Sequence, residues 1–357
     1  MPCTIMQCGE GDAAEFHVTA TPGAGTDLFA EVAAALRQQG ARILQERIFI
    51  QSAAIADCRD RRQAVYGDLD DGIEPTWLQA PAGRSGPLAA ISVHAVSDHH
   101  PMTVVGRHLR ILNHPAAGLV TVSGLDAATS PNVATQIRDL WTLLATELGQ
   151  AGIGLDRLAR TWLWLDPMAT WYGELNQARN ACFRSHGLIA ADGRPVHLPA
   201  STGIGLRPQR GNIAVDAIAA LHGPGPTLFA AGGRQDCALG YGSAFSRAAQ
   251  VRTPSGLTLF ISGTAAIDAA GRTLYVGDRE GQVRETIRCV QAILAQTGGR
   301  AEEIVQGVAY GVDEAVLALW NRYNPGWELV PVLADICRED LLFEIELSAC
   351  PGARRVV

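Results

Sequence analysis

The run Leu119-Val-Thr-Val-Ser-Gly-Leu125 recurs as Leu259-Phe-Ile-Ser-Gly-Thr264, and this repetition decides the fold class. Each run is rich in β-forming residues and ends in or just after Ser-Gly. A polar loop, a segment with helical spacing, a glycine-rich break and a second β-rich run follow each copy in the same order. Because the copies start at positions 119 and 259, the period is about 140 residues, which is typical of repeated structural units.

The residues also place the individual elements of each copy. The segments with helical spacing cover 134–148 and 282–294, and the second β-rich runs cover 158–165 and 304–310. A fainter copy at the front keeps the same order, with β-rich runs at 15–20 and 43–50 around a helical segment at 27–39 and Gly40.

Three copies in one chain predict an α+β fold built from three tandem units that close into a ring. We expect the units to cover residues 1–98, 105–222 and 240–350, with linkers rich in turn-forming residues at 97–108 and 223–226. Clefts are expected at the unit boundaries, because pockets favour boundaries between domains.

The C-terminal run Phe343-Glu-Ile-Glu-Leu347 alternates apolar and acidic residues. Side chains on a strand alternate between its two faces, so Glu344 and Glu346 are expected on one face and the apolar residues on the other. Cys337 lies seven residues before Glu344, close enough in sequence to share a pocket. Two interpretations fit the pattern equally: a solvated face of an amphipathic strand, and a pair of acids in a substrate site.

Composition describes a compact chain with a large core. Of 357 residues, 47% are hydrophobic and 18% are charged, and no window approaches the roughly 18 apolar residues of a membrane span. Residues 1–10 lack the basic and apolar regions of a secretory signal, so a cytoplasmic location is expected. The net charge of -7 argues against nucleic acid as a partner.

The eight cysteines are dispersed, without the spacing of a zinc site, so we expect free thiols and neither a metal nor a cofactor. All 29 basic residues are arginine, so any site for an anion is expected to use guanidinium groups, backbone N–H groups and hydroxyls.

Several further runs carry a family resemblance. They are Tyr172-Gly-Glu-Leu-Asn-Gln-Ala-Arg179, Pro199-Ala-Ser-Thr-Gly-Ile-Gly205, Tyr241-Gly-Ser-Ala-Phe-Ser-Arg-Ala248, Phe260-Ile-Ser-Gly-Thr-Ala265, and Asp335-Ile-Cys-Arg338 with Glu344-Ile-Glu346. With them the chain resembles the Rid (YjgF) superfamily, small proteins that assemble as trimers with sites between subunits. Within it, the second and third units are similar to the chorismatases, which remove the enolpyruvyl group of chorismate.

The resemblance implies three Rid-like (chorismate mutase-like) units fused into an intrachain pseudo-trimer, and therefore a monomer or a weak oligomer. It also implies a site with Glu344 as the general acid. The substrate-binding residues that it implies are Tyr172, Arg179, Tyr241, Arg247, Thr264, Ala265 and Cys337. Among these, Arg179 and Tyr172 bind a substrate carboxylate, Arg247 supplies the second cation, and Ala265 and Cys337 line the end of the site that takes the ring.

The second unit has Ala214 where the third has Glu344, so that copy is expected to be catalytically empty. Imine and enamine deaminases of the Rid family carry an arginine on the strand before the acid. Residues 199–202 and 329–333 contain none, which disfavours imine hydrolysis because the substrate carboxylate would lose a bidentate anchor.

Chorismate is a dianion with an enol ether, so its cleavage needs two sets of carboxylate partners and an acid that protonates the methylene carbon. Tyr172 and Arg179 stand seven residues apart, which on a helix places them on one face. The alternatives are a surface position for Arg179, an interunit salt bridge for Arg247, and a buried structural thiol for Cys337.

Three functions therefore stay open. The first is chorismatase-like cleavage to pyruvate plus a dihydrodiol or hydroxybenzoate, or the same reaction on a related cyclic carboxylate. The second is Rid-type imine or enamine hydrolysis, and the third is a non-catalytic protein that binds a small carboxylate.

Overall fold

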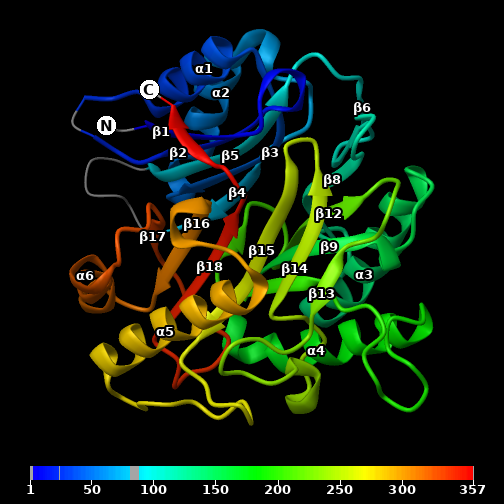
Figure 1. Ribbon diagram of the computed structural model, residues 1–357, viewed down its shortest axis with the longest axis vertical. Helices are drawn as coiled ribbons and strands as arrows, with labels where there is room; N and C mark the ends of the chain where they lie inside the picture. The colour runs from blue at the N-terminus through cyan, green and yellow to red at the C-terminus, as the bar shows by residue number, and fades with distance from the viewer. Residues whose placement is uncertain (1–2, 24, 81–87, 357) are drawn as a thin grey trace.

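In the part of the chain that the structure describes, three mixed β-sheets meet at the centre, and six α-helices cover their outer faces (Figure 1). The computed structural model describes residues 3–23, 25–80 and 88–356. Each sheet with its two helices forms one unit, so the predicted α+β fold of three similar units is confirmed.

Unit 1 has the strand order β11-β4-β3-β5-β2-β1-β19. Its own elements are β1 (Cys3–Cys8), β2 (Glu15–Ala20), α1 (Leu28–Gln39), β3 (Ala41–Ile50), α2 (Ile55–Tyr66), β4 (Thr76–Gln79) and β5 (Leu88–Ser97). The edge strands come from elsewhere in the chain: β11 (Arg207–Pro208) pairs with β4, and β19 (Arg354–Val356) pairs with β1. The C-terminus thus returns to the first unit and closes the ring.

Unit 2 has the order β10-β9-β12-β8-β7-β6. Its elements are β6 (Met102–Val105), β7 (Leu109–Leu112), β8 (Leu119–Asp126), α3 (Val133–Gln150), β9 (Leu158–Leu165), α4 (Met168–Ser185), β10 (Ala200–Ile204) and β12 (Ile213–Ala220). The expectation of a linker over 97–108 is wrong in part, because β6 lies inside it and hydrogen-bonds to β7.

Unit 3 has the order β13-β14-β15-β18-β16-β17. Its elements are β13 (Thr227–Phe229), β14 (Ala248–Thr253), β15 (Gly256–Ala265), α5 (Arg279–Thr297), β16 (Ile304–Gly311), α6 (Glu314–Tyr323), β17 (Val330–Leu333) and β18 (Phe343–Ala349). The exact limits 1–98, 105–222 and 240–350 stay a prediction.

Equivalent helix ends reflect the repeated sequence. The carboxylate of Asp27 accepts hydrogen bonds from the first-turn N–H groups of α1, and Asp278 does the same for α5. Gly40 and Gly298 end these helices in the left-handed conformation, with φ of 56° and 77°. The glycine breaks in the sequence are therefore helix ends.

Equivalent strands pair in the same register in each of the three sheets. The central strands β3, β9 and β16 each pair with an antiparallel neighbour, β5, β12 and β18. Three pairs occupy equivalent positions: Phe49 with Ala90, Trp164 with Ala214, and Tyr310 with Glu344. Among these equivalent positions, only unit 3 carries an acid.

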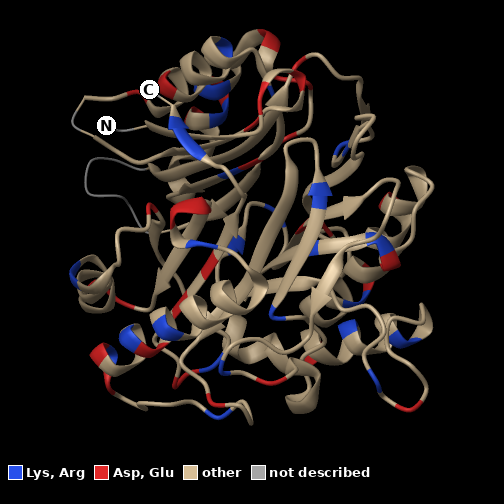
Figure 2. Cartoon of the chain, viewed as in Figure 1, with Lys and Arg blue, Asp and Glu red and all other residues tan. Residues whose placement is uncertain are grey.

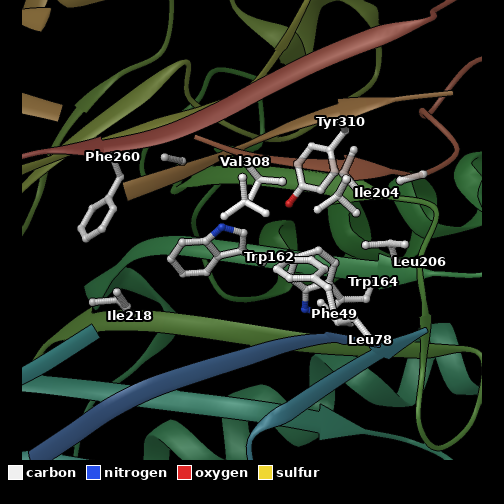
Figure 3. Close-up of a cluster of buried hydrophobic side chains, with 14 of the residues drawn as sticks. Phe49, Leu78, Trp162, Trp164, Ile204, Leu206, Ile218, Phe260, Val308 and Tyr310 are labelled. Atoms are coloured by element: carbon white, nitrogen blue, oxygen red, sulfur yellow. The ribbon is translucent and has the colours of Figure 1, made fainter. Parts of the chain in front are cut away.

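A shared core fills the space where the sheets meet (Figure 3). The ring of Phe49 packs edge-on against Trp164 at 6.5 Å, and Trp162 packs edge-on against Phe260 at 6.3 Å. Each pair joins two units, so burial of aromatic surface holds neighbouring units together.

Most of the charged residues belong to the outer helices and loops (Figure 2). Within the described ranges, none of the helices is long and apolar enough to cross a membrane.

Candidate functional site

A cavity between unit 2 and unit 3 contains the acid that the sequence singled out. Unit 2 contributes side chains from β9, α4 and β10, and unit 3 contributes side chains from β15, β18 and the segments before β14 and β18. We call it the Glu344 cavity. It lies at a unit boundary, as expected for a ring of three units.

Glu344 lies on β18, opposite Ala265 of β15 and Tyr310 of β16. Its side chain is 5% exposed, and its strand neighbours Phe343 and Ile345 point the other way into the core beneath α5. The solvated-face interpretation of this strand is therefore wrong, because both of its faces are buried.

Burial raises the pKa of Glu344 to about 8, and the negative charge of Glu346 contributes to this rise. The positive charges of Arg160, Arg247 and Arg338 oppose the rise. A carboxyl group in this position keeps its proton at neutral pH and can act as a general acid.

Glu346 shares the face of β18 with Glu344 but has a different environment. One carboxylate oxygen accepts hydrogen bonds from Arg160, Trp162 and Thr202, all of unit 2. The other accepts one from the Tyr310 hydroxyl at 3.2 Å. Glu346 therefore has a cation and several hydrogen-bond donors as partners, whereas Glu344 forms no ion pair within the described residues.

The close approach of β15 to Glu344 depends on Gly263. A Cβ atom at this position would collide with the Oε1 atom of Glu344 and lie 3.2 Å from Cγ2 of Thr202. The backbone N–H of Gly263 donates to the hydroxyl of Thr202 at 2.9 Å, which fixes this strand against β10.

Three guanidinium groups line the cavity around the acid. Arg179 of α4 is 3% exposed and donates to Asn176, while its Nε has no partner among the described residues. Arg247 is 1% exposed and donates to the Asp236 carbonyl and, at 2.8 Å, to the Tyr241 hydroxyl.

These contacts rule out the alternative interpretations of Arg179 and Arg247. The surface position for Arg179 is wrong, because the side chain is buried. The interunit salt bridge for Arg247 is also wrong, because within the described parts of the chain its guanidinium meets neutral acceptors and no carboxylate.

Arg338 is the third cation. It donates to the Gly271 carbonyl, and its guanidinium lies 5.3 Å from the ring centre of Tyr241. Phe245 packs between the other two cations, at 5.8 Å from Arg179 and 5.3 Å from Arg247. Aromatic faces thus hold the arginine side chains in place.

Two tyrosines and a cysteine complete the polar lining. The hydroxyl of Tyr172 lies 3.2 Å from Oγ of Ser243. Burial raises the pKa of Cys337 to about 12, and the nearby Glu344 adds to the rise. The thiol is therefore protonated at neutral pH and is no nucleophile.

Seven of the eight predicted site residues line this one cavity: Glu344, Tyr172, Arg179, Tyr241, Arg247, Ala265 and Cys337. Thr264 does not. It is fully buried, and its hydroxyl donates to the Ser262 carbonyl at 2.8 Å, because neighbouring residues on β15 point to opposite faces.

Sequence reasoning missed Arg338, Phe245 and Gly263 as lining residues. All three lie inside the runs that carried the family resemblance, and Arg338 follows Cys337 directly. Their position in those runs is the sequence feature that could have identified them as lining residues. In the described part of the chain, no three His, Cys, Asp or Glu side chains gather so that they could hold a metal ion.

Comparisons with known proteins agree with this architecture. No family model matches the sequence, and no curated protein matches it. A crystal structure of a chorismatase superposes with a TM-score of 0.65 at 20% identity, covering 94% of this chain and 98% of that one.

Shorter structures match single stretches. A Rid-family protein of unknown function from Yersinia pestis covers 30% of this chain and 86% of its own, at 23% identity and a TM-score of 0.26. A member of the YjgF/YER057c/UK114 family from Mycobacterium tuberculosis covers 35% of this chain and 98% of its own, at 19% identity and a TM-score of 0.27. Over 94% of its length, this chain has the fold of a chorismatase.

Proposed function

We propose that the protein is a chorismatase-type enzyme that cleaves the enolpyruvyl ether of chorismate, or of a related cyclic carboxylate, in the Glu344 cavity. The observation that carries the proposal is the charge pattern of this cavity. A buried, protonated carboxyl group stands among three guanidinium groups, none of which has a carboxylate partner among the described residues. A dianion with one site for protonation matches this pattern.

Each cation has a distinct part in binding. Arg247 is held by Asp236 and Tyr241, and Arg179 by Asn176, so both guanidinium groups are fixed before the substrate arrives. Fixed donors bind a carboxylate with little loss of side-chain freedom. We assign one substrate carboxylate to Arg179 with Tyr172, and the other to Arg247, with Arg338 beside it.

Glu344 then transfers its proton to the methylene carbon of the enol ether. The transfer makes a methyl group and leaves an oxocarbenium ion next to the new Glu344 carboxylate, whose charge stabilises the cation. Water adds to the cationic carbon and gives a hemiketal. One proton of the added water passes to the Glu344 carboxylate and restores the acid. The other, on the hemiketal hydroxyl, passes to the ring oxygen as the C–O bond to the ring breaks and pyruvate leaves.

Cys337 and Ala265 have no part in these proton transfers. The protonated thiol and the small methyl side chain line the cavity together with Leu341 and leave space for the ring. We assign them to ring binding. The choice between a dihydrodiol and a hydroxybenzoate as the ring product is an outcome of the experiment below.

The test is incubation of the purified protein with chorismate. Pyruvate release is followed by a coupled lactate dehydrogenase assay, and the ring product is identified by chromatography. We expect turnover by the wild type and its loss in E344Q. The amide of E344Q is neutral like the acid but cannot donate the proton, so binding of chorismate should stay within about threefold by calorimetry, on the order of 0.6 kcal/mol.

Glu302 is 68% exposed and serves as the matched control, since E302Q should keep full turnover. Binding of chorismate by the wild type and by E344Q, with pyruvate released by neither, would favour the carboxylate-binding function. The absence of both binding and pyruvate would refute the proposed substrate. Turnover of an imine substrate that E344Q also abolishes would favour the Rid-type hydrolase.

A further inference from the structure

A second cavity lies between unit 1 and unit 2, at the place that corresponds to the Glu344 cavity. Ala214 lines it where Glu344 lines the other, and Gly124 stands where Gly263 stands. Trp77 of β4 takes the place of Gly203 of β10. We call it the Ala214 cavity. Equivalent strands line it, but it has no carboxyl group at the position of Glu344.

Two side chains that line the Ala214 cavity each carry a buried polar atom with no hydrogen-bond partner among the described residues. The atoms are Oγ of Ser123 and Nε1 of Trp77, and the side chains are 1% and 2% exposed. The equivalent Ser262 of unit 3 differs, because its Oγ accepts a bond from the Ser201 N–H and donates to the Ser246 carbonyl.

Folded proteins pair nearly all buried polar atoms. The fold of unit 3 supplies hydrogen-bond partners for the hydroxyl of Ser262, but the same fold in unit 2 supplies none for Ser123 among the described residues. Because both unpaired atoms belong to side chains that line one cavity, they indicate a ligand that binds in this cavity.

The charges of the Ala214 cavity define what it can bind. Arg210 is paired with Asp126 at 2.9 Å, so these charges cancel. Glu74 also lines the cavity, and its charge is balanced by Arg59 at 2.7 Å. Arg107 lies on the exposed turn between β6 and β7, lines the cavity, and makes no ion pair within the described ranges. One cation is left without a counter-charge, which fits a single carboxylate.

The cavity is open to solvent. Trp77, Arg107 and Arg210 also line a wider hollow on the surface next to it. Pro75 and Pro208 form an apolar part of the lining, which suits a carbon skeleton. A small molecule could thus enter from the surface and present its polar groups to the two unpaired atoms.

We propose that the Ala214 cavity binds a small hydroxylated monocarboxylate and leaves it chemically unchanged. Arg107 binds the carboxylate, and the Trp77 N–H and Ser123 hydroxyl bind oxygen atoms of the ligand. Ala214 supplies no proton, so no reaction follows. The ligand joins β4 of unit 1 to β8 of unit 2, and the site is independent of the function proposed for the Glu344 cavity.

The test is calorimetric titration of the full-length protein with 3-hydroxybenzoate as the probe. We expect R107Q to weaken one binding event at least tenfold and S123A to weaken the same event about fivefold. R138Q removes an exposed arginine of α3 that lines neither cavity and should change nothing. R179Q, in the Glu344 cavity, should also leave this event unchanged.

Thermal unfolding separates binding from structure. Because Oγ of Ser123 has no partner to lose, S123A should unfold at the same temperature as the wild type or higher. The proposal is overturned if no binding is measured up to about millimolar probe. It is also overturned if only R179Q removes the binding, because the probe then occupies the Glu344 cavity. Loss in R107Q and not in R179Q supports this site, even if the proposed function fails.

Discussion

Glu344 pairs with Ala265 of β15, but its carboxyl group lies against Gly263, and it fits there because this residue is a glycine. Nothing but a hydrogen atom fits at Gly263, since a Cβ atom would meet both the carboxyl group of Glu344 and Thr202. The φ angle of Gly263 is not in the left-handed region, so space and not backbone conformation requires glycine here. One absent side chain thus positions the proposed acid.

We expect G263A to lower kcat for pyruvate release about 100-fold, because displacement of a reacting group by about an ångström costs this much. Overpacking should also lower the free energy of unfolding by about 1–3 kcal/mol. G173A is the control, since it adds the same methyl group to an exposed position of α4 with nothing within 4 Å.

G173A should keep full turnover and raise the free energy of unfolding by about 0.5–1 kcal/mol, because alanine favours the helix. Turnover by G263A at the wild-type rate would contradict the assigned position of Glu344. Steady-state kinetics and urea unfolding measure both effects.

At the scale of the element, β18 sets two carboxyl groups two residues apart on one face. Glu346 is paired with Arg160. Burial, together with the negative charge of Glu346, holds the pKa of Glu344 at about 8, far above its usual 4.5. The surroundings of this strand thus keep Glu344 in the protonated form that general acid catalysis uses.

The pH dependence of activity follows from this shift. Because the protonated form of Glu344 is the acid, kcat/KM should stay constant below about pH 8 and fall about tenfold per pH unit above it. A pH profile of pyruvate release measures it, with the coupling enzyme in excess at every pH. A fall centred near pH 4.5 would show that the environment of Glu344 does not hold the proton.

Stability should depend on the same group. A raised pKa in the folded state contributes stability that is fully present below about pH 4.5 and is lost as the pH rises through about 8. The wild type should therefore lose on the order of a few kcal/mol more than E344Q between about pH 5 and pH 9. Urea unfolding of both proteins at the two pH values tests this difference.

At the scale of the whole molecule, buried ion pairs join the units around the ring. Arg47 of unit 1 reaches Asp216 of unit 2 at 2.8 Å, and Arg160 of unit 2 reaches Glu346 of unit 3. Between unit 3 and unit 1, Gln306 bonds to the carbonyls of Val18 and Val93 instead. With β19 paired to β1 the ring is closed, and we expect a monomer in solution.

Removal of one partner from such a pair leaves a buried charge. We expect R47M to lower the free energy of unfolding by about 3–5 kcal/mol, because Asp216 is fully buried and loses its cation. The double variant R47M/D216N should recover part of this loss, since it removes the uncompensated charge. A loss below about 1 kcal/mol in R47M would show that the pair does not hold units 1 and 2 together.

Much of the fold could be predicted from the sequence, because strand and helix periods and glycine breaks are local properties of the chain. The order of elements in each unit, the shared face of Glu344 and Glu346, and the absence of an acid at Ala214 all follow from such local patterns. Seven site residues came from the family resemblance, and the structure places them around one cavity.

Contacts between units could not be read in this way, because they join residues far apart in the chain. Alternation places two acids on one face of β18, but only the packing of unit 2 against that face buries them, pairs Glu346 with Arg160 and leaves Glu344 unpaired. The same holds for Ser123, whose motif matches Ser262 while its surroundings do not. The sequence by itself determined the three units and the positions of the acids, and the tertiary structure decided that Glu344 keeps its proton, because a pKa depends on burial and on neighbouring charges.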